Sequence, residues 1–100
     1  MKILLDHMDQ IHQLCLANQV KTLFAFGSVV TERFNADSDI DLVVDIEEED
    51  PFSYSDKYFD VLFNLEDMLE RPIDLLESRS LRNKYIKEAI EANKVLIYER

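Results

Sequence analysis

Two short segments organise this sequence of 100 residues: Phe24-Ala25-Phe26-Gly27-Ser28 and Asp39-Ile40-Asp41-Leu42-Val43-Val44-Asp45-Ile46. The first is an apolar run that stops at Gly27, which is the only glycine in the chain. Such a run predicts a buried strand, residues 20–26, followed by a tight turn and a short helix over residues 28–33. A glycine at this point lets a ligand approach the backbone, and the first amides of a helix attract an anion. Gly27 and Ser28 are therefore predicted to seat a phosphate group.

The second segment predicts a strand over residues 39–46 whose two faces differ in chemistry. Residues i and i+2 of a strand point to the same face, so Asp39 and Asp41 project together while Ile40 and Leu42 point into the core. A third carboxylate, Asp74, interrupts another short apolar run that follows Pro72. Two carboxylates held about 4 Å apart repel by roughly 4 kcal/mol at an effective dielectric of 20. That is a large share of the roughly 5–15 kcal/mol that stabilises a whole domain.

A bound cation explains why a chain would keep such a cluster. Oxygen ligands suit Mg²⁺ or Mn²⁺, and Mg²⁺ commonly binds one or two carboxylates together with the phosphates of a nucleotide. We therefore predict that Asp39, Asp41 and Asp74 are metal ligands and that the substrate is a nucleoside triphosphate. Each motif alone has a plainer explanation, a simple turn for Gly27-Ser28 and a solvated strand edge for the aspartates. Their combination favours the metal–nucleotide site.

At these residues the sequence resembles a known family. Gly27-Ser28, the ten residues that follow and Asp39-Ile40-Asp41 are similar to the signature of the polymerase-β-like nucleotidyltransferase superfamily, and Asp74 matches its third carboxylate. The short length and the Ser-Asp-Ile-Asp-Leu motif resemble those of the minimal nucleotidyltransferases, which are antitoxins found beside HEPN-domain toxins in prokaryotes. The resemblance covers roughly residues 24–76. It departs at Thr31, where many members have Arg, and at Glu32, where many have Gly.

The resemblance implies a specific activity and a mixed β-sheet. The reaction would be Mg²⁺-dependent transfer of a nucleoside monophosphate, AMP from ATP, to an acceptor hydroxyl on a HEPN toxin partner. Asp39 and Asp41 would hold two metal ions, and Asp74 would ligate the ion on the acceptor side and help remove the hydroxyl proton. Gly27 and Ser28 would seat the β- and γ-phosphates. Two alternatives stay open: a non-catalytic antitoxin that neutralises its partner by binding, and a nucleotidyltransferase for a small molecule.

Composition excludes several other classes. The chain has 21 acidic and 11 basic residues, a formal net charge of −10, which disfavours nucleic acid as a direct partner. Cys15 is the only cysteine, so neither an intrachain disulfide nor a zinc site built from thiolates is possible, and we expect it in the core. No apolar stretch approaches the roughly 20 residues of a membrane span. We expect a soluble cytoplasmic protein; the oligomeric state, including a homo-oligomer, stays open.

The remaining pattern predicts one domain over residues 1–100 with a small α/β fold, a mixed sheet and helices mainly on one face. His7 and His12 are five residues apart, a poor spacing for a shared helix face, and are predicted on the surface. Arg33 is a candidate phosphate contact, and Arg71 looks like an ordinary helix-end charge. The other expected elements are an amphipathic helix over 2–18, an acidic loop over 47–55, a helix over 55–70, a strand over 73–77, a helix from Ser80 with Leu81, Tyr85, Ile86, Ala89 and Ile90 buried, and an edge strand over 95–98.

Overall fold

The computed structural model describes residues 1–100 and confirms the small α/β fold with a mixed sheet. In chain order the helices and strands are α1 (Lys2–Leu5), α2 (Met8–Ala17), β1 (Val20–Phe26), η1 (Gly27–Val30), β2 (Ile40–Ile46), α3 (Pro51–Leu69), β3 (Ile73–Glu77), η2 (Ser78–Ser80), α4 (Lys84–Asn93) and β4 (Val95–Glu99), where η marks a 3₁₀ helix. Both β1 and β3 have the predicted bounds.

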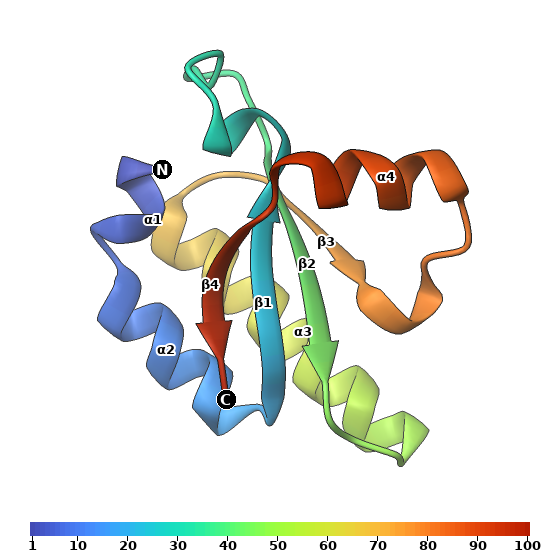
Figure 1. Cartoon of the computed structure of the whole chain (residues 1–100). Coiled ribbons are helices and arrows are strands. Elements are labelled where there is room, and N and C mark those ends of the chain that lie inside the picture. Colours follow the sequence, from blue (N-terminus) through green and yellow to red (C-terminus); the bar gives the residue numbers. More distant parts are fainter.

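The four strands lie in the order β3-β2-β1-β4. β1 is antiparallel to both β2 and β4, whereas β2 and β3 are parallel (Figure 1). The carboxyl end of β1 therefore meets the amino ends of β2 and β3 at one edge of the sheet. This topology brings Gly27 close to the segments that carry the three predicted aspartates, which are separated from it by up to 47 positions in sequence.

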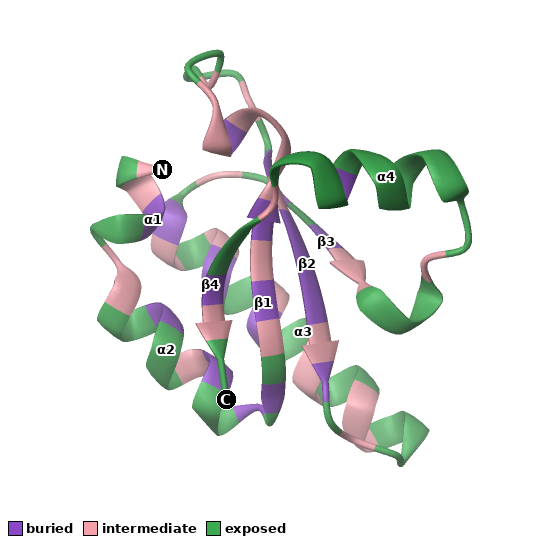
Figure 2. Cartoon of the chain, in the orientation of Figure 1, coloured by how far each residue is buried: buried purple, intermediate pink, exposed green.

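One hydrophobic core lies between the sheet and the first three helices, where the buried positions of the strands gather (Figure 2). The strands contribute alternate residues, as in Ile40, Leu42 and Val44 of β2, each fully buried. Cys15 is buried in this core as predicted, and burial raises the pKa of its thiol to about 12. α4 lies over the opposite face of the sheet (Figure 1). None of the helices combines the length and apolarity needed to cross a membrane.

The predicted helix over residues 2–18 is wrong in one respect, because it is broken at Asp6 and His7 into α1 and α2. The backbone N–H of His7 donates to the Leu4 carbonyl at 3.1 Å, three residues back. The carbonyl of Ile3, which an uninterrupted helix would pair with that N–H, instead hydrogen-bonds the Nδ1 atom of the His7 ring at 2.9 Å. A local side chain thus competes with the helical ladder and ends it.

The predicted loop over residues 47–55 is also wrong in its second half, because α3 begins at Pro51. Proline interrupts a helix interior but is well suited to the first helical position, where its missing N–H would have no partner. Asp50 is the N-cap, and its carboxylate accepts a hydrogen bond from the Ser53 backbone N–H at 2.9 Å. Pro51 therefore starts α3 rather than separating a loop from it.

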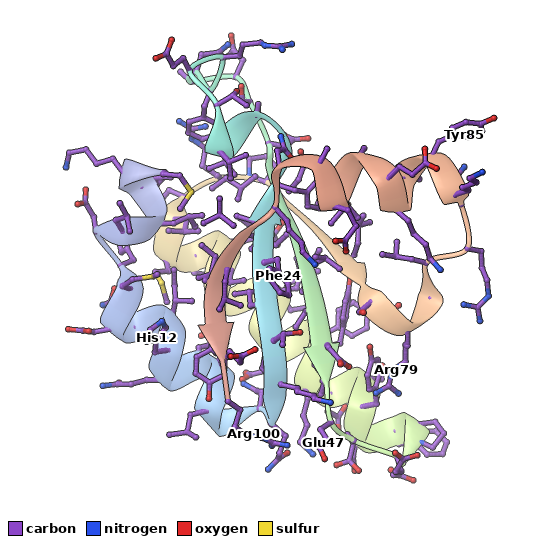
Figure 3. The ribbon with its side chains drawn as sticks, viewed as in Figure 1. His12, Phe24, Glu47, Arg79, Tyr85 and Arg100 are labelled. Carbon is purple, nitrogen blue, oxygen red and sulfur yellow. The ribbon has the colours of Figure 1, made fainter.

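α4 departs most from prediction. It begins at Lys84 rather than Ser80, because the Asn83 side chain caps it by accepting from the backbone N–H groups of Tyr85 and Ile86. The predicted buried stripe is wrong: Tyr85 is 80% exposed, whereas Ile90 is the only buried residue of the helix. Tyr85 points away from the sheet at the outer end of α4 (Figure 3). The periodic pattern indicates an amphipathic helix, but the rest of the chain buries only Ile90 of its apolar side.

The capping geometry of α3 gives a testable prediction. Replacing Asp50 with Ala should lower the free energy of unfolding by about 1 kcal/mol, because the Ser53 N–H loses its acceptor. Urea unfolding followed by circular dichroism measures this change. Asp56→Ala, which removes an exposed acid from the body of the same helix, is the control and should not destabilise the protein. An equal loss in both variants would contradict the cap.

Candidate active site

The central contact of the site joins the end of β1 to the start of β2. Phe26 and Asp41 are register partners in the antiparallel pair, so Asp41 lies beside Gly27, the next residue after Phe26. Gly27 has φ +72°, in the left-handed region that favours glycine. A Cβ atom built on Gly27 would lie 2.5 Å from the Asp41 Oδ2 atom. Only a residue without a side chain allows this backbone turn and this carboxylate to occupy the same place.

The three predicted carboxylates come from neighbouring elements. Asp41 and Asp74 are register partners in the parallel pair of β2 and β3, and Asp39 directly precedes β2. Asp41 is half-buried, whereas Asp39 and Asp74 are exposed, so Asp74 interrupts the apolar run of β3 at an exposed position. Burial raises the pKa of the Asp41 carboxyl, and the negative charges of Asp74 and Asp39 raise it further. Ionised Asp41 is thus held in an unfavourable environment.

These residues match a divalent cation in donor chemistry, since all three supply carboxylate oxygens. No group of three or more His, Cys, Asp or Glu side chains converges closely enough to hold a metal ion in this structure. The parallel register brings Asp41 and Asp74 onto adjacent strands, and Asp39 adds its charge from the preceding loop. Repulsion between like charges is a physical reason for such carboxylates to stay apart when no cation lies between them.

A small polar pocket adjoins Gly27. It has a volume of about 180 Å³ and no apolar lining residue; its walls are Gly27, Ser28, Thr31, Arg33 and Asn93. Arg33 is the only charged residue that lines it, as expected of a candidate phosphate contact. The predicted short helix over residues 28–33 is instead the single 3₁₀ turn η1, closed by the Thr31 hydroxyl and N–H, which both donate to the Ser28 carbonyl at 2.9 Å. Anion binding here would depend on individual amides and Arg33 rather than on a helix dipole.

The two departures from the family signature differ in position. Thr31 lines the polar pocket, so the hydroxyl stands where many members have a guanidinium group. Glu32 is exposed and does not line the pocket. The acid at position 32 therefore lies outside the pocket, and Thr31 is the departure that changes its lining.

Sequence reasoning missed two residues at the site. Arg71, predicted to be an ordinary helix-end charge, donates from Nη1 to the carbonyls of Asn35 and Ser38, both at 2.9 Å, and its guanidinium lies 4.5 Å from the Phe34 ring centroid. It thereby fixes the loop that leads into Asp39. Asn93, the last residue of α4, lines the polar pocket. Both act across more than 30 positions of sequence, and no local pattern marks them.

His7 and His12 lie apart, as their spacing in the sequence indicates. His7 and His12 hydrogen-bond different backbone carbonyls, those of Ile3 and Ile97, at 2.9 and 2.8 Å. His12 is exposed on α2 (Figure 3), and His7 is half-buried beside α1. The His7 ring closes the end of α1 and the His12 ring joins α2 to β4, so both have structural contacts away from the candidate site.

A comparison with protein families matches nearly the whole chain. Residues 9–100 match the family described as "Polymerase beta, Nucleotidyltransferase". This chain belongs to the polymerase-β nucleotidyltransferase family. The matched region contains Gly27, Ser28 and all three aspartates. The family resemblance of the sequence and the expectation of a nucleotidyltransferase are thereby confirmed.

Relatives and solved structures agree with this assignment. The nucleotidyltransferase is 35% identical over 80 residues to a Methanocaldococcus jannaschii protein named "Putative protein adenylyltransferase MJ1379", with 80% of this chain and 77% of the relative covered. A solved "putative minimal nucleotidyltransferase" shares its fold with a TM-score of 0.76 at 23% identity, covering 94% of this chain and 92% of that one. A chain from the complex of the tri-AMPylated Shewanella oneidensis HEPN toxin with MNT antitoxin gives a TM-score of 0.66 at 17% identity, covering 97% of this chain and 73% of that one.

The close contact at Gly27 predicts a coupled effect of two substitutions. Gly27→Ala should destabilise the protein by more than the roughly 1–2 kcal/mol that a left-handed conformation costs an L-residue, because the new Cβ also meets the Asp41 carboxylate. In an Asp41→Ala background that contact is gone, so Gly27→Ala should cost less. Urea unfolding of the four proteins of this cycle measures the coupling. Equal costs in both backgrounds would show that the carboxylate does not press on Gly27.

The raised pKa of Asp41 predicts a pH-dependent stability. The folded state holds the Asp41 proton more tightly than the unfolded state, so ionisation of Asp41 costs stability above the folded-state pKa. Asp41→Asn removes that cost and should raise the melting temperature at pH 7. The gain should shrink as pH falls through the folded-state pKa and vanish below the ordinary value of 3.8. Thermal unfolding at several pH values measures it.

Asp45→Asn is the matched control for this experiment. It makes the same replacement on the same strand, four positions further on, away from Asp39 and Asp74. A melting-temperature gain in Asp41→Asn that persists unchanged at pH 3 would contradict the electrostatic origin, because both states are then protonated.

Proposed function

We propose that this nucleotidyltransferase transfers AMP from ATP to a hydroxyl of a HEPN toxin and thereby acts as its antitoxin. The observation that carries the proposal is the Asp41 carboxylate packed on the Gly27 backbone, between the polar pocket and Asp74. The relative named as a protein adenylyltransferase supports the reaction, and the fold shared with the antitoxin of an AMPylated toxin supports the partner.

Asp39, Asp41 and Asp74 would hold Mg²⁺ or Mn²⁺. When bound, the ions would offset the charge of the carboxylates and of the triphosphate and stabilise an in-line displacement. The structure supports this role through the raised pKa of Asp41, since a group whose ionised form is disfavoured gains most from a nearby cation.

The polar pocket would seat the β- and γ-phosphates. Gly27 contributes backbone that a ligand can approach closely, and Ser28 a hydroxyl; Arg33 contributes the positive charge and Asn93 an amide. These groups would hold the triphosphate so that its α-phosphorus lies beside Asp41. Positioning of this kind supplies much of the catalysis in phosphoryl transfer.

Asp74 would act on the acceptor. It is exposed, so a hydroxyl of a docked protein can reach it, whereas Asp41 is partly covered by Gly27. The acceptor oxygen forms a bond to the α-phosphorus as the bond from that phosphorus to the bridging oxygen of the β-phosphate breaks. The hydroxyl proton passes to the Asp74 carboxylate and pyrophosphate leaves.

Exposed apolar side chains support a protein acceptor. On α3, Phe59 is 46% and Phe63 55% exposed, and their rings stack with the centroids 5.6 Å apart. Large apolar groups that stay in solvent together often mark protein contact surfaces. In this proposal residues 1–100 form one nucleotidyltransferase domain, and a docked partner would supply the surface that closes the site and excludes water from it.

Binding without catalysis is the second candidate. It is favoured by one observation, that the three carboxylates do not converge into a ligand set in this structure. Asp39 and Asp74 are also exposed, so burial adds no cost to keeping their charges without a bound cation. A purely occluding antitoxin would need neither Mg²⁺ nor ATP.

Mass spectrometry of the partner distinguishes the two functions. We expect a HEPN toxin co-expressed with this protein to carry additions of one AMP mass each on a hydroxyl residue. With purified proteins, modification should require ATP and Mg²⁺. Asp41→Asn should abolish it, because the aspartate next to the reacting phosphate loses its charge, while Asp45→Asn should leave it intact.

The same preparations show whether inhibition follows modification. A toxin that stays unmodified but is still inhibited at one-to-one stoichiometry, by wild type and Asp41→Asn alike, would establish the occluding antitoxin and remove the enzymatic proposal for this pair.

A further inference from the structure

A second hollow lies between α4 and the sheet. It has a volume of about 90 Å³ and opens into an outer hollow of about 280 Å³ that shares four of its residues. We name the inner hollow the α4 groove; its lining residues are Thr22, Phe24, Val43, Ser78, Leu81, Ile90, Glu91 and Lys94. Phe24 lies on β1 in the middle of the sheet, below α4 (Figure 3). The groove contributes nothing to the phosphate and metal chemistry described above.

The α4 groove lies in line with the candidate active site. Val43 is two residues after Asp41 on β2, so it faces the same side of the sheet about 7 Å further along the strand. Phe24 is the register partner of Val43, just as Phe26 is that of Asp41. The polar pocket, the carboxylates and the α4 groove therefore follow one another along one face of the sheet.

A nucleoside triphosphate has its parts in the same order. With its β- and γ-phosphates at Gly27 and its α-phosphate at Asp41, its nucleoside would extend away from the polar pocket, along β2 toward Val43. α4 borders both ends of this path, because Asn93 lines the polar pocket and the next residue, Lys94, lines the α4 groove.

The chemistry of the α4 groove suits a flat heterocycle. Phe24, Val43, Leu81 and Ile90 form apolar walls, and four polar side chains offer hydrogen bonds at the rim: those of Thr22, Ser78, Glu91 and Lys94. Apolar walls with a few polar groups are the usual composition of a small-molecule site. We infer that the α4 groove binds the nucleobase of the nucleoside triphosphate, an inference that rests on the proposed function.

The Phe24 ring is available for stacking. The Lys94 ammonium lies over the ring, 4.4 Å from its centroid. Lys94 also donates to Glu91 Oε1 at 2.8 Å, which gives the ammonium a second partner at the rim. A base that enters the groove would replace the ammonium on the ring face, and bases stack on aromatic side chains whatever their identity. Ile90 is the only buried residue of α4, so little packing opposes this adjustment.

Two probes separate base binding from phosphate binding. Inorganic tripolyphosphate carries the phosphates alone, and the α,β-methylene analogue of ATP adds the nucleoside but cannot transfer AMP. With Mg²⁺ present, isothermal titration calorimetry gives Kd for each. We expect wild-type protein to bind the ATP analogue roughly 5- to 150-fold more tightly, the range that corresponds to stacking of one base on an aromatic side chain.

Variants of the α4 groove should remove the difference in Kd between the two probes without weakening phosphate binding. Leu81→Ser and Phe24→Leu should bring the ratio of the two Kd values toward one while the Kd of tripolyphosphate stays unchanged. Ile86→Ser is the matched control, because it makes a similar apolar-to-polar change at an exposed position of α4 outside the groove, and it should keep the wild-type ratio. Leu81 lies in the loop between η2 and α4, so Leu81→Ser still tests the base site if Phe24→Leu fails to fold.

The outcomes separate this inference from the proposed function. A wild-type ratio that survives in both groove variants, or that falls equally in Ile86→Ser, would overturn the α4 groove as the base site and leave the proposed function standing. Failure of wild-type protein to bind either probe would overturn both.

Discussion

The candidate site depends on one steric constraint, the absence of a side chain at Gly27. The antiparallel register of β1 and β2 sets Phe26 opposite Asp41. This brings the Asp41 carboxylate against Gly27, the residue that follows β1, whose backbone is in the left-handed conformation. A slip of one residue would move Ile40 and Leu42 out of the core and Asp41 into it. Core packing therefore fixes the register, and the register in turn fixes the distance between the turn and the carboxylate.

This arrangement brings three carboxylates near one another in a protein whose formal net charge is already −10. Asp41 has a raised pKa because burial and the charges of Asp74 and Asp39 act in the same direction. Apolar packing of the neighbouring residues on β2 offsets that cost, and Arg71 holds the preceding loop through two carbonyls. Residues outside the site thus stabilise it against the repulsion between its carboxylates. Functional sites commonly have such unfavourable local electrostatics until a ligand binds.

The sequence predicted what depends on local pattern and missed what depends on tertiary contact. β1 and β3 followed from short apolar runs, and the neighbourhood of Gly27, Asp41 and Asp74 from motif spacing. The acidic run predicts a loop over residues 47–55, whereas Pro51 follows the Asp50 N-cap and so stands at the position where proline favours the start of a helix. Tyr85 was placed in the core because periodicity shows that a helix has an apolar side without showing what covers it. Arg71 and Asn93 reach the site through folding alone, so no spacing could have indicated them.

The charge balance also explains why metal and nucleotide would have to bind together. Arg33 is the only cation that lines the polar pocket, and three carboxylates stand beside it. A triphosphate that approached this edge alone would meet a net repulsion, since the single charge of one guanidinium cannot offset the charges of three carboxylates. Divalent cations bound at this edge would reverse the sign of the interaction, and the same carboxylates would attract them. A net charge of −10 disfavours the long polyanion of a nucleic acid but is compatible with a short polyanion that brings its own cations.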